Sequence, residues 1–146
     1  MSARHDAVAA LVRLADSPHV PDRADAGRAL SSFAEMAEAR EPLLTLVLDA
    51  HDTFVTEETT EALLRRHDKA GLTVVAAAIG TADENTLDHL HDAVTAVLSI
   101  YSRDRDAALR VCQELRDDTD ERVRSGADQL IADLTEITPV LVPAGE

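Results

Sequence analysis

A repeat of 33 to 35 residues is the feature that most constrains the fold of this chain. Two adjacent apolar residues recur at positions 29–30, 62–63, 97–98 and 130–131, which gives steps of 33, 35 and 33 residues. A period in this range is typical of helical hairpins stacked on one another, because each hairpin buries its apolar face against its neighbours. The sequence therefore predicts an all-α chain of about four helical hairpins.

The composition suits helices that approach closely. The 146 residues are 45% hydrophobic but only 2% aromatic, so the core must consist of Ala, Leu and Val. A chain of this length fits one domain that buries roughly 68–70% of its unfolded surface. We expect one domain over residues 1–138, with units at about 4–37, 38–68, 69–102 and 103–138, and a short tail over residues 139–146.

Apolar periodicity predicts eight helices in four pairs. The segment Leu72–Ile79 is apolar nearly all round, and its β-branched residues would also suit a buried strand. Its three consecutive alanines and its place in a helical repeat favour a central helix that is covered on both sides. The predicted helices span residues 4–15, 22–37, 41–50, 72–79, 86–101, 105–116 and 120–137, with the fourth helix beginning near residue 56.

This register also gives several residues a structural role. Phe33 and Tyr101 fall on stripes that should face the core, and Pro42 falls in the first turn of its helix, where its missing N–H costs little. The single cysteine, Cys112, lies on an apolar stripe and should behave as a small hydrophobic residue rather than a nucleophile. The pairs His51-Asp52 and His67-Asp68 fall at helix–loop junctions, where they suit capping or turns better than catalysis.

The last unit resembles a HEAT or HEAT-like repeat. The resemblance rests on Asp120-Glu121-Arg122-Val123-Arg124-Ser125-Gly126-Ala127 and the following Leu130. In that motif an Asp caps the second helix, Val and Ala contact the partner helix, and Leu fills the groove between them. Weaker copies begin at Asp52 and Asp22, and the third unit departs most, with Asn85 or Asp88 in place of the Asp.

The resemblance implies a right-handed α-α superhelix, a short α-solenoid in which the second helix of each pair lines a concave groove. HEAT-like repeats form a class of scaffolds, so the resemblance implies a fold rather than an activity. The outward residues that we expect to line this groove are Arg23, Arg28, Glu57, Glu58, Glu61, Arg65, Asp88, His89, Asp92, Ser99, Arg122, Ser125 and Asp128.

The charge of the chain limits the classes of partner that it is expected to bind. It carries 28 acidic and 14 basic residues, a net charge of −14, and the span 71–102 has four acids and no Lys or Arg. Nucleic acids and anionic membrane surfaces attract Lys and Arg, so neither is an expected partner. The surplus acid either attracts a basic protein or only keeps the chain dissolved. Without a leader or a long apolar run, we expect a cytoplasmic protein.

No motif for chemistry stands out. The chain has no Gly-rich phosphate loop and no Gly-x-Ser-x-Gly elbow, so we expect no enzyme activity and no cofactor. A weaker alternative is a metal-dependent enzyme that uses Asp88, His91 and Asp92, which lie on one helical stripe. Metal binding needs three converging ligands, and we do not expect a metal at this position.

The leading hypothesis is a non-enzymatic protein-interaction module that presents an acidic groove to a basic partner. One concrete candidate within this class is an inhibitor or immunity-type protein that covers the basic active site of a nucleic-acid-cleaving toxin. The alternative is a structural homo-oligomer joined through an exposed edge helix such as Arg4–Ala15.

Overall fold

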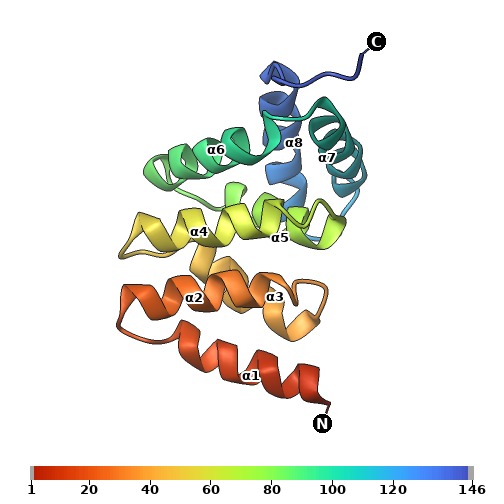
Figure 1. Cartoon of the computed structure of the whole chain (residues 1–146). Coiled ribbons are helices and arrows are strands. Elements are labelled where there is room, and N and C mark those ends of the chain that lie inside the picture. Colours follow the sequence, from red (N-terminus) through yellow and green to blue (C-terminus); the bar gives the residue numbers. More distant parts are fainter. Residues whose placement is uncertain (1, 145–146) are drawn as a thin grey trace.

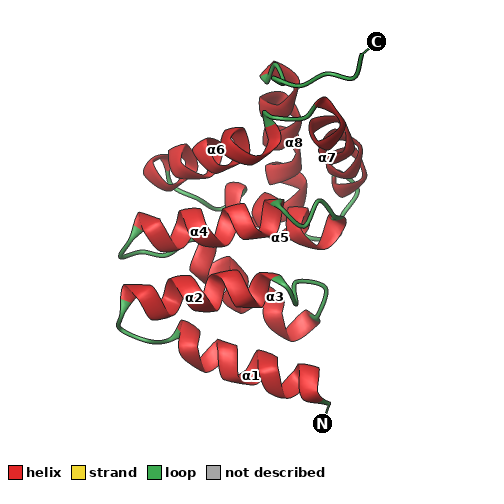
Figure 2. Cartoon of the chain, in the orientation of Figure 1, coloured by secondary structure: helices red, strands yellow, loops and turns green. Residues whose placement is uncertain are grey.

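A computed structural model describes residues 2–144, and within this span the chain forms eight α-helices and no strand longer than a single bridge (Figures 1 and 2). The all-α prediction is confirmed. The helices are α1 (Ala3–Ala15), α2 (Val20–Ser31), α3 (Ala37–Val47), α4 (Thr53–Leu64), α5 (Lys69–Ile79), α6 (Glu84–Leu98), α7 (Ser102–Leu115) and α8 (Glu121–Glu136).

The helices form two rows. The second helices of the first three hairpins, α2, α4 and α6, pack side by side, and the first helices α1, α3, α5 and α7 pack on one another in the other row (Figure 1). The last hairpin departs from this order, because α8 packs mainly on α5 and α7 instead of extending the row formed by α2, α4 and α6. As a result, α4 and α6 share a surface that α8 does not continue.

Glycine permits the close contact between α5 and α8. A Cβ atom added to Gly126 would lie 1.7 Å from the backbone oxygen of Ala76, and one added to Gly80 would lie 2.2 Å from the backbone oxygen of Arg122. Backbone oxygens cannot move aside as side chains can, so a larger residue at either position would push the two helices apart. In the sequence, this close packing is therefore indicated by two glycines, one at the end of α5 and one in α8.

The core consists of small aliphatic side chains, as the composition predicts. Every residue from Gly71 to Ile79 is buried, so this apolar segment is the central helix that the repeat predicts. Phe33 is half-buried and packs against this core, as predicted, whereas the other two aromatic side chains lie at the surface. Phe54 is 45% exposed and Tyr101 is 43% exposed. The prediction that Tyr101 faces the core is wrong, because α6 ends at Leu98 and Tyr101 becomes the cap of α7.

Several predicted helix boundaries are also wrong, and the largest errors are at the end of α2 and the start of α3. α2 ends at Ser31 instead of residue 37, and the chain turns over residues 32–36, where Arg66 Nη1 donates a hydrogen bond of 2.8 Å to the backbone oxygen of Ser31. α3 consequently begins at Ala37, which places Pro42 inside the helix and not in its first turn. The contact at the end of α2 comes from Arg66, 35 residues away, so local sequence does not encode it.

Aspartates cap four of the helices. The carboxylates of Asp52, Asp68 and Asp120 accept hydrogen bonds from backbone N–H groups in the first turns of α4, α5 and α8, as the sequence predicts. Because Asp52 is the cap, α4 begins at Thr53, three residues before the predicted start. In the third unit Asp83 caps α6, so the expectation that Asn85 or Asp88 holds this place is wrong.

The segment after α8 pairs with the loop between α6 and α7. The backbone N–H groups of Val140 and Leu141 donate to the oxygens of Ser99 and Ile100, at 2.9 and 2.7 Å, and Ser102 N–H donates to the oxygen of Leu141 at 3.0 Å. These bonds form a short parallel bridge between Tyr101 and Leu141. The described part of the predicted tail is therefore held against the helices.

Candidate functional site

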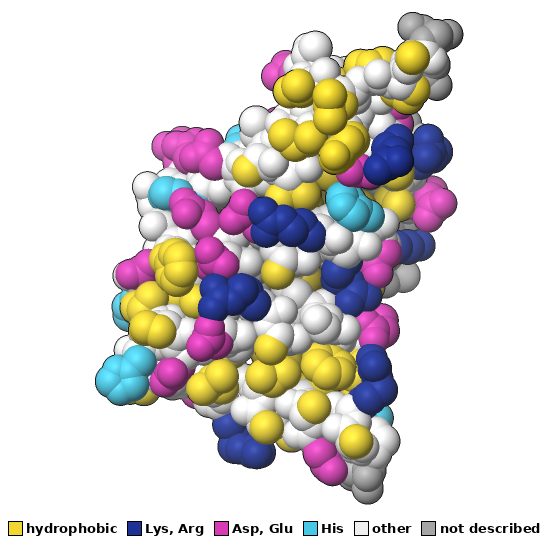
Figure 3. Space-filling model, in the orientation of Figure 1, with side chains coloured by type: hydrophobic (Ala, Val, Ile, Leu, Met, Phe, Trp, Pro, Cys, Tyr) yellow, Lys and Arg dark blue, Asp and Glu magenta, His cyan; other side chains and the backbone are white. Residues whose placement is uncertain are grey.

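An acidic groove lies between α4 and α6. Glu57 and Glu61 are one helical turn apart on α4, and Asp92 faces them from α6, with Ala93 and Ala96 between the two helices. The hollow has a volume of about 190 Å³. Acidic side chains gather on this side of the molecule, at the left of Figure 3. The structure thus brings together three carboxylates that the sequence predicted on two different helices.

The groove has a small apolar floor and a charged rim. Ala93 is buried and Ala96 is exposed, whereas Glu57 and Glu61 are half-buried and Asp92 is exposed. Alanines leave room for the aliphatic stem of a Lys or Arg side chain, whose charged end would then reach the carboxylates. This arrangement suits a cationic side chain from outside the chain better than a small anion.

Basic side chains of the chain itself contact three glutamates at and beside the rim. His89 Nδ1 lies 3.0 Å from Glu57 Oε1, Arg65 Nη2 lies 3.4 Å from Glu61 Oε1, and Arg28 Nη1 lies 2.8 Å from Glu58 Oε2. The hydrogen bond with Glu58 raises the pKa of Arg28 above its ordinary value. Within residues 2–144, Asp88 and Asp92 have no ion partner, so the negative charge of the groove is concentrated on α6.

Three predicted groove residues lie elsewhere. Arg122 Nη2 lies 2.8 Å from Asp120 and 3.1 Å from Glu41 of α3, and Asp128 pairs with Arg116 at 3.0 Å. Ser125 is exposed on the same helix. These residues of α8 do not extend the groove, because α8 turns onto α5. The observed groove therefore involves only α4 and α6, with Arg28 of α2 at its edge.

Arg23, which we expected to face outward, is buried instead. Its guanidinium donates from Nε to Asp49 Oδ2 at 2.8 Å and from Nη1 to the backbone oxygen of Ser17 at 3.1 Å. Burial alone would raise the pKa of Asp49, but hydrogen bonds from Arg23 and from the N–H groups of His51 and Asp52 hold this pKa below its ordinary value. The pair connects the first turn of α2 to the loop after α3, beside an open hollow of about 620 Å³.

The residues of the metal alternative point in different directions. His91 Nε2 lies 2.8 Å from Asp133 Oδ2 on α8, whereas Asp92 faces α4. Burial raises the pKa of Asp133, an effect that His91 opposes and Glu136 supports. Across residues 2–144, no three His, Cys, Asp or Glu side chains are arranged to hold a metal ion. The converging ligands that this alternative requires are not formed by Asp88, His91 and Asp92.

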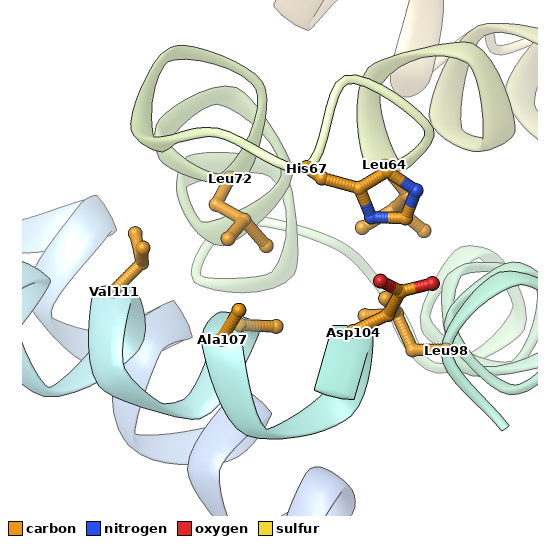
Figure 4. Close-up of a pocket in the computed structure, with 8 residues that line it drawn as sticks. Leu64, His67, Leu72, Leu98, Asp104, Ala107 and Val111 are labelled. Carbon is orange, nitrogen blue, oxygen red and sulfur yellow. The ribbon is translucent and has the colours of Figure 1, made fainter. Parts of the chain in front are cut away.

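A third hollow lies where α4, α5, α6 and α7 meet (Figure 4). His67, whose φ is 55°, and Asp104 lie near each other at one end of this pocket, and aliphatic side chains line the rest. The free volume is about 10 Å³, which accommodates at most about one water molecule. This pocket is too small for a metabolite.

Cys112 lies in the core on α7. It is fully buried, and this burial raises the pKa of its thiol to about 12. A thiol with so high a pKa is a poor nucleophile near neutral pH. The interpretation of Cys112 as a small hydrophobic residue is confirmed.

Within residues 2–144 there is no helix with the length and apolar character needed to cross a bilayer. No protein family description and no curated protein matches this chain. A crystal structure of an engineered protein is similar over 93% of this chain, with 22% sequence identity and a TM-score of 0.38, and the chain spans 65% of that protein's length. A structural similarity this low supports no conclusion on fold family or function.

Proposed function

We propose that this chain is a non-enzymatic protein-interaction module that binds a basic partner through the groove between α4 and α6. The observation that carries the proposal is the convergence of Glu57, Glu61 and Asp92 from two adjacent helices around a floor of alanines. A Lys or Arg side chain of the partner lies in this groove, with its stem on Ala93 and Ala96 and its charged end among the carboxylates.

The charge of the whole chain supports this choice of partner. A net charge of −14 attracts basic proteins over a distance and repels nucleic acids and anionic membranes. The basic side chains at the rim, Arg28, Arg65 and His89, each contact a glutamate, so they leave Asp88 and Asp92 to the partner. Binding should weaken as the salt concentration rises, because the carboxylates of the groove are half-exposed or exposed and salt screens their charge.

We further propose that the architecture is a short HEAT-like repeat array located in the cytoplasm. The side-by-side packing of α2, α4 and α6 and the capping Asp120 of the last unit support a repeat of this type. Within this class, an inhibitor or immunity-type protein is the concrete candidate. A neighbouring reading frame that encodes a basic, toxin-like protein would support it, and its consistent absence would argue against it.

The binding proposal is tested with a peptide of nine arginines, whose affinity is measured by fluorescence anisotropy at low salt. The variant Glu61→Gln/Asp92→Asn removes two groove charges. The matched control Asp117→Asn/Glu121→Gln removes two exposed charges, one after α7 and one at the first residue of α8. We expect the groove variant to weaken binding by about tenfold and the control by less than about twofold. Equal losses in both variants, or no binding by the unchanged protein, would overturn the proposal.

A further inference from the structure

The helix α1 closes one end of the molecule. It packs on α2 and α3, and Val8 is the residue of α1 that this packing buries completely (Figure 1). The opposite side of α1 faces outward along its whole length. Hydrophobic surface follows this edge at the bottom of Figure 3, together with one basic and one acidic patch.

Three exposed residues define the outward face of α1. At 100° per residue, Asp6, Ala10 and Arg13 lie within about 60° of one another, on the side opposite Val8. The other basic residues of α1 contact acids near the start of α3, since Arg4 pairs with Glu35 and the His5 ring lies beside Glu38. Asp6 and Arg13 have no ion partner among residues 2–144. An acid and a base are thus presented two turns apart, with a small residue between them.

We propose that this face of α1 binds the same face of a second copy, as a symmetric antiparallel dimer. When a two-fold axis passes between Ala9 and Ala10, residue number i of one helix lies opposite residue 19 − i of the other. Asp6 of each copy then faces Arg13 of the other, which gives two equivalent ion pairs. A parallel arrangement would place Asp6 against Asp6, so the order of the charges selects the antiparallel one.

Small side chains make this crossing close. Ala10 lies at the centre, so the helix axes can approach to the lower end of the usual range of about 8–10 Å. The contact is short, because a helix of 13 residues is only about 20 Å long. It buries less than the roughly 800 Å² per partner of a standard stable interface. The dimer is therefore weak, reversible and sensitive to salt.

This dimer leaves the acidic groove free. Neither α4 nor α6 takes part in the contact, so the two proposals stand or fall separately. A dimer would present two copies of the groove, which strengthens binding to a partner that carries two basic segments. The molecule therefore has two proposed binding surfaces, the groove for a basic partner and the face of α1 for a second copy of the chain.

The test is sedimentation equilibrium at about 0.15 M salt, which screens the repulsion between two copies of net charge −14, over about 10 μM to about 1 mM protein, the range of a weak interface. The weight-average mass should rise from 15.7 kDa toward twice that value. Arg13→Asp and Asp6→Arg should each lower the association constant at least about tenfold, and the double variant should restore it to within about threefold. Arg110→Asp makes the same charge change at an exposed position of α7 and should leave association unchanged.

Several outcomes would overturn the proposal. The first is a mass of 15.7 kDa at every concentration, and the second is an equal loss of association in Arg13→Asp and Arg110→Asp. Failure of the double variant to restore association would also contradict the paired geometry. Ala10→Glu, which places a carboxylate at the crossing, provides a further check. It should abolish association while its far-UV circular dichroism stays unchanged, and association that persists in this folded variant would exclude this face.

Discussion

Two helix crossings in this molecule depend on glycine but differ in what the glycine meets. In the crossing of α2 on α4, a Cβ on Gly27 would lie 1.9 Å from the side-chain oxygen of Thr59. In the crossing of α5 on α8, a Cβ on Gly126 would lie 1.7 Å from a backbone oxygen. A side chain can rotate away, whereas a helical carbonyl cannot, so the second crossing is the more tightly specified of the two.

The same two regions differ in how charge is used. The first two hairpins are connected by Arg23 and Asp49, whose side chains are only 10% and 7% exposed. Between residues 69 and 144, no ion pair is buried to this extent on both sides. The C-terminal half relies instead on the apolar α5 and its close contact with α8. Similar hairpins are thus fixed by a polar connection in one half and by backbone proximity in the other.

The largest effect is expected from Gly126→Ala. The added methyl group meets the carbonyl of Ala76, so α8 must separate from α5, at a cost of about 3 kcal/mol or more in the free energy of unfolding. Urea denaturation measures this loss. The neighbouring exposed Ser125→Ala should change stability by less than about 0.5 kcal/mol. A value for Gly126→Ala near that of Ser125→Ala would contradict the crossing as described.

The buried ion pair gives the next effect. Asp49→Asn leaves Arg23 buried without a charged partner and should cost about 3 kcal/mol near neutral pH. Because the folded-state pKa of Asp49 is lowered, its stabilisation is fully present above about pH 4, the ordinary Asp value, and is lost as pH falls through the lowered pKa.

Denaturation at a series of pH values checks this sign. The difference in stability between the unchanged protein and Asp49→Asn should shrink below about pH 4. The exposed Asp16→Asn serves as the control and should show no such difference. A gap between the two proteins that stays constant down to about pH 2 would argue against the role of Asp49.

A smaller loss is expected from Gly27→Ala, about 1–2 kcal/mol, because Thr59 can yield. The variant Gly27→Ala/Thr59→Ala removes the opposing hydroxyl and should be more stable than the sum of the single losses predicts. Ala76→Gly should give no such rescue of Gly126→Ala, since that contact is with backbone. Denaturation measures both double variants. If the second substitution restored stability equally at both crossings, the two crossings would not differ in the way described.

The smallest effect is a gain. Thr60 is buried in α4, and its hydroxyl has no hydrogen-bond partner among the described residues. Thr60→Val keeps the shape and removes this unpaired group, so it should raise the free energy of unfolding by about 1 kcal/mol. Thr73→Val is the comparison, because the Thr73 hydroxyl donates to the oxygen of Lys69 at 2.7 Å. It should be neutral or destabilising, and a larger gain there would contradict the explanation.

Periodicity predicted the number of helices and the central place of α5, because burial on both sides leaves a clear apolar pattern. It did not predict where α2 ends. The segment after Ser31 has ordinary helix-forming residues, and at this turn Arg66, which is distant in the sequence, donates a hydrogen bond to the oxygen of Ser31. It also missed the turning of α8, although Gly126 lies within the motif that resembles a HEAT-like repeat. A small residue in a motif indicates a close approach but not the helix that approaches.

The candidate site, like the fold, could be predicted from the sequence only in part. One helical turn separates Glu57 from Glu61, so their common face follows from sequence, and the repeat placed Asp92 opposite them on the neighbouring second helix. Arg122, Ser125 and Asp128 were assigned to the groove by the same rule, which failed where the last hairpin leaves the row. Arg23 was misplaced because its charge suggested the surface, while its partner Asp49 lies in another unit.

The buried Cys112 allows the opening of the protein to be measured by thiol labelling. As the single thiol of the chain, packed on α7 within the core, it can react with a thiol reagent only when α7 opens. At high reagent concentration the labelling rate equals the opening rate, and at low concentration it reports the opening equilibrium. The detachment of one helix from the rest can therefore be timed in the unmodified sequence, without an introduced label.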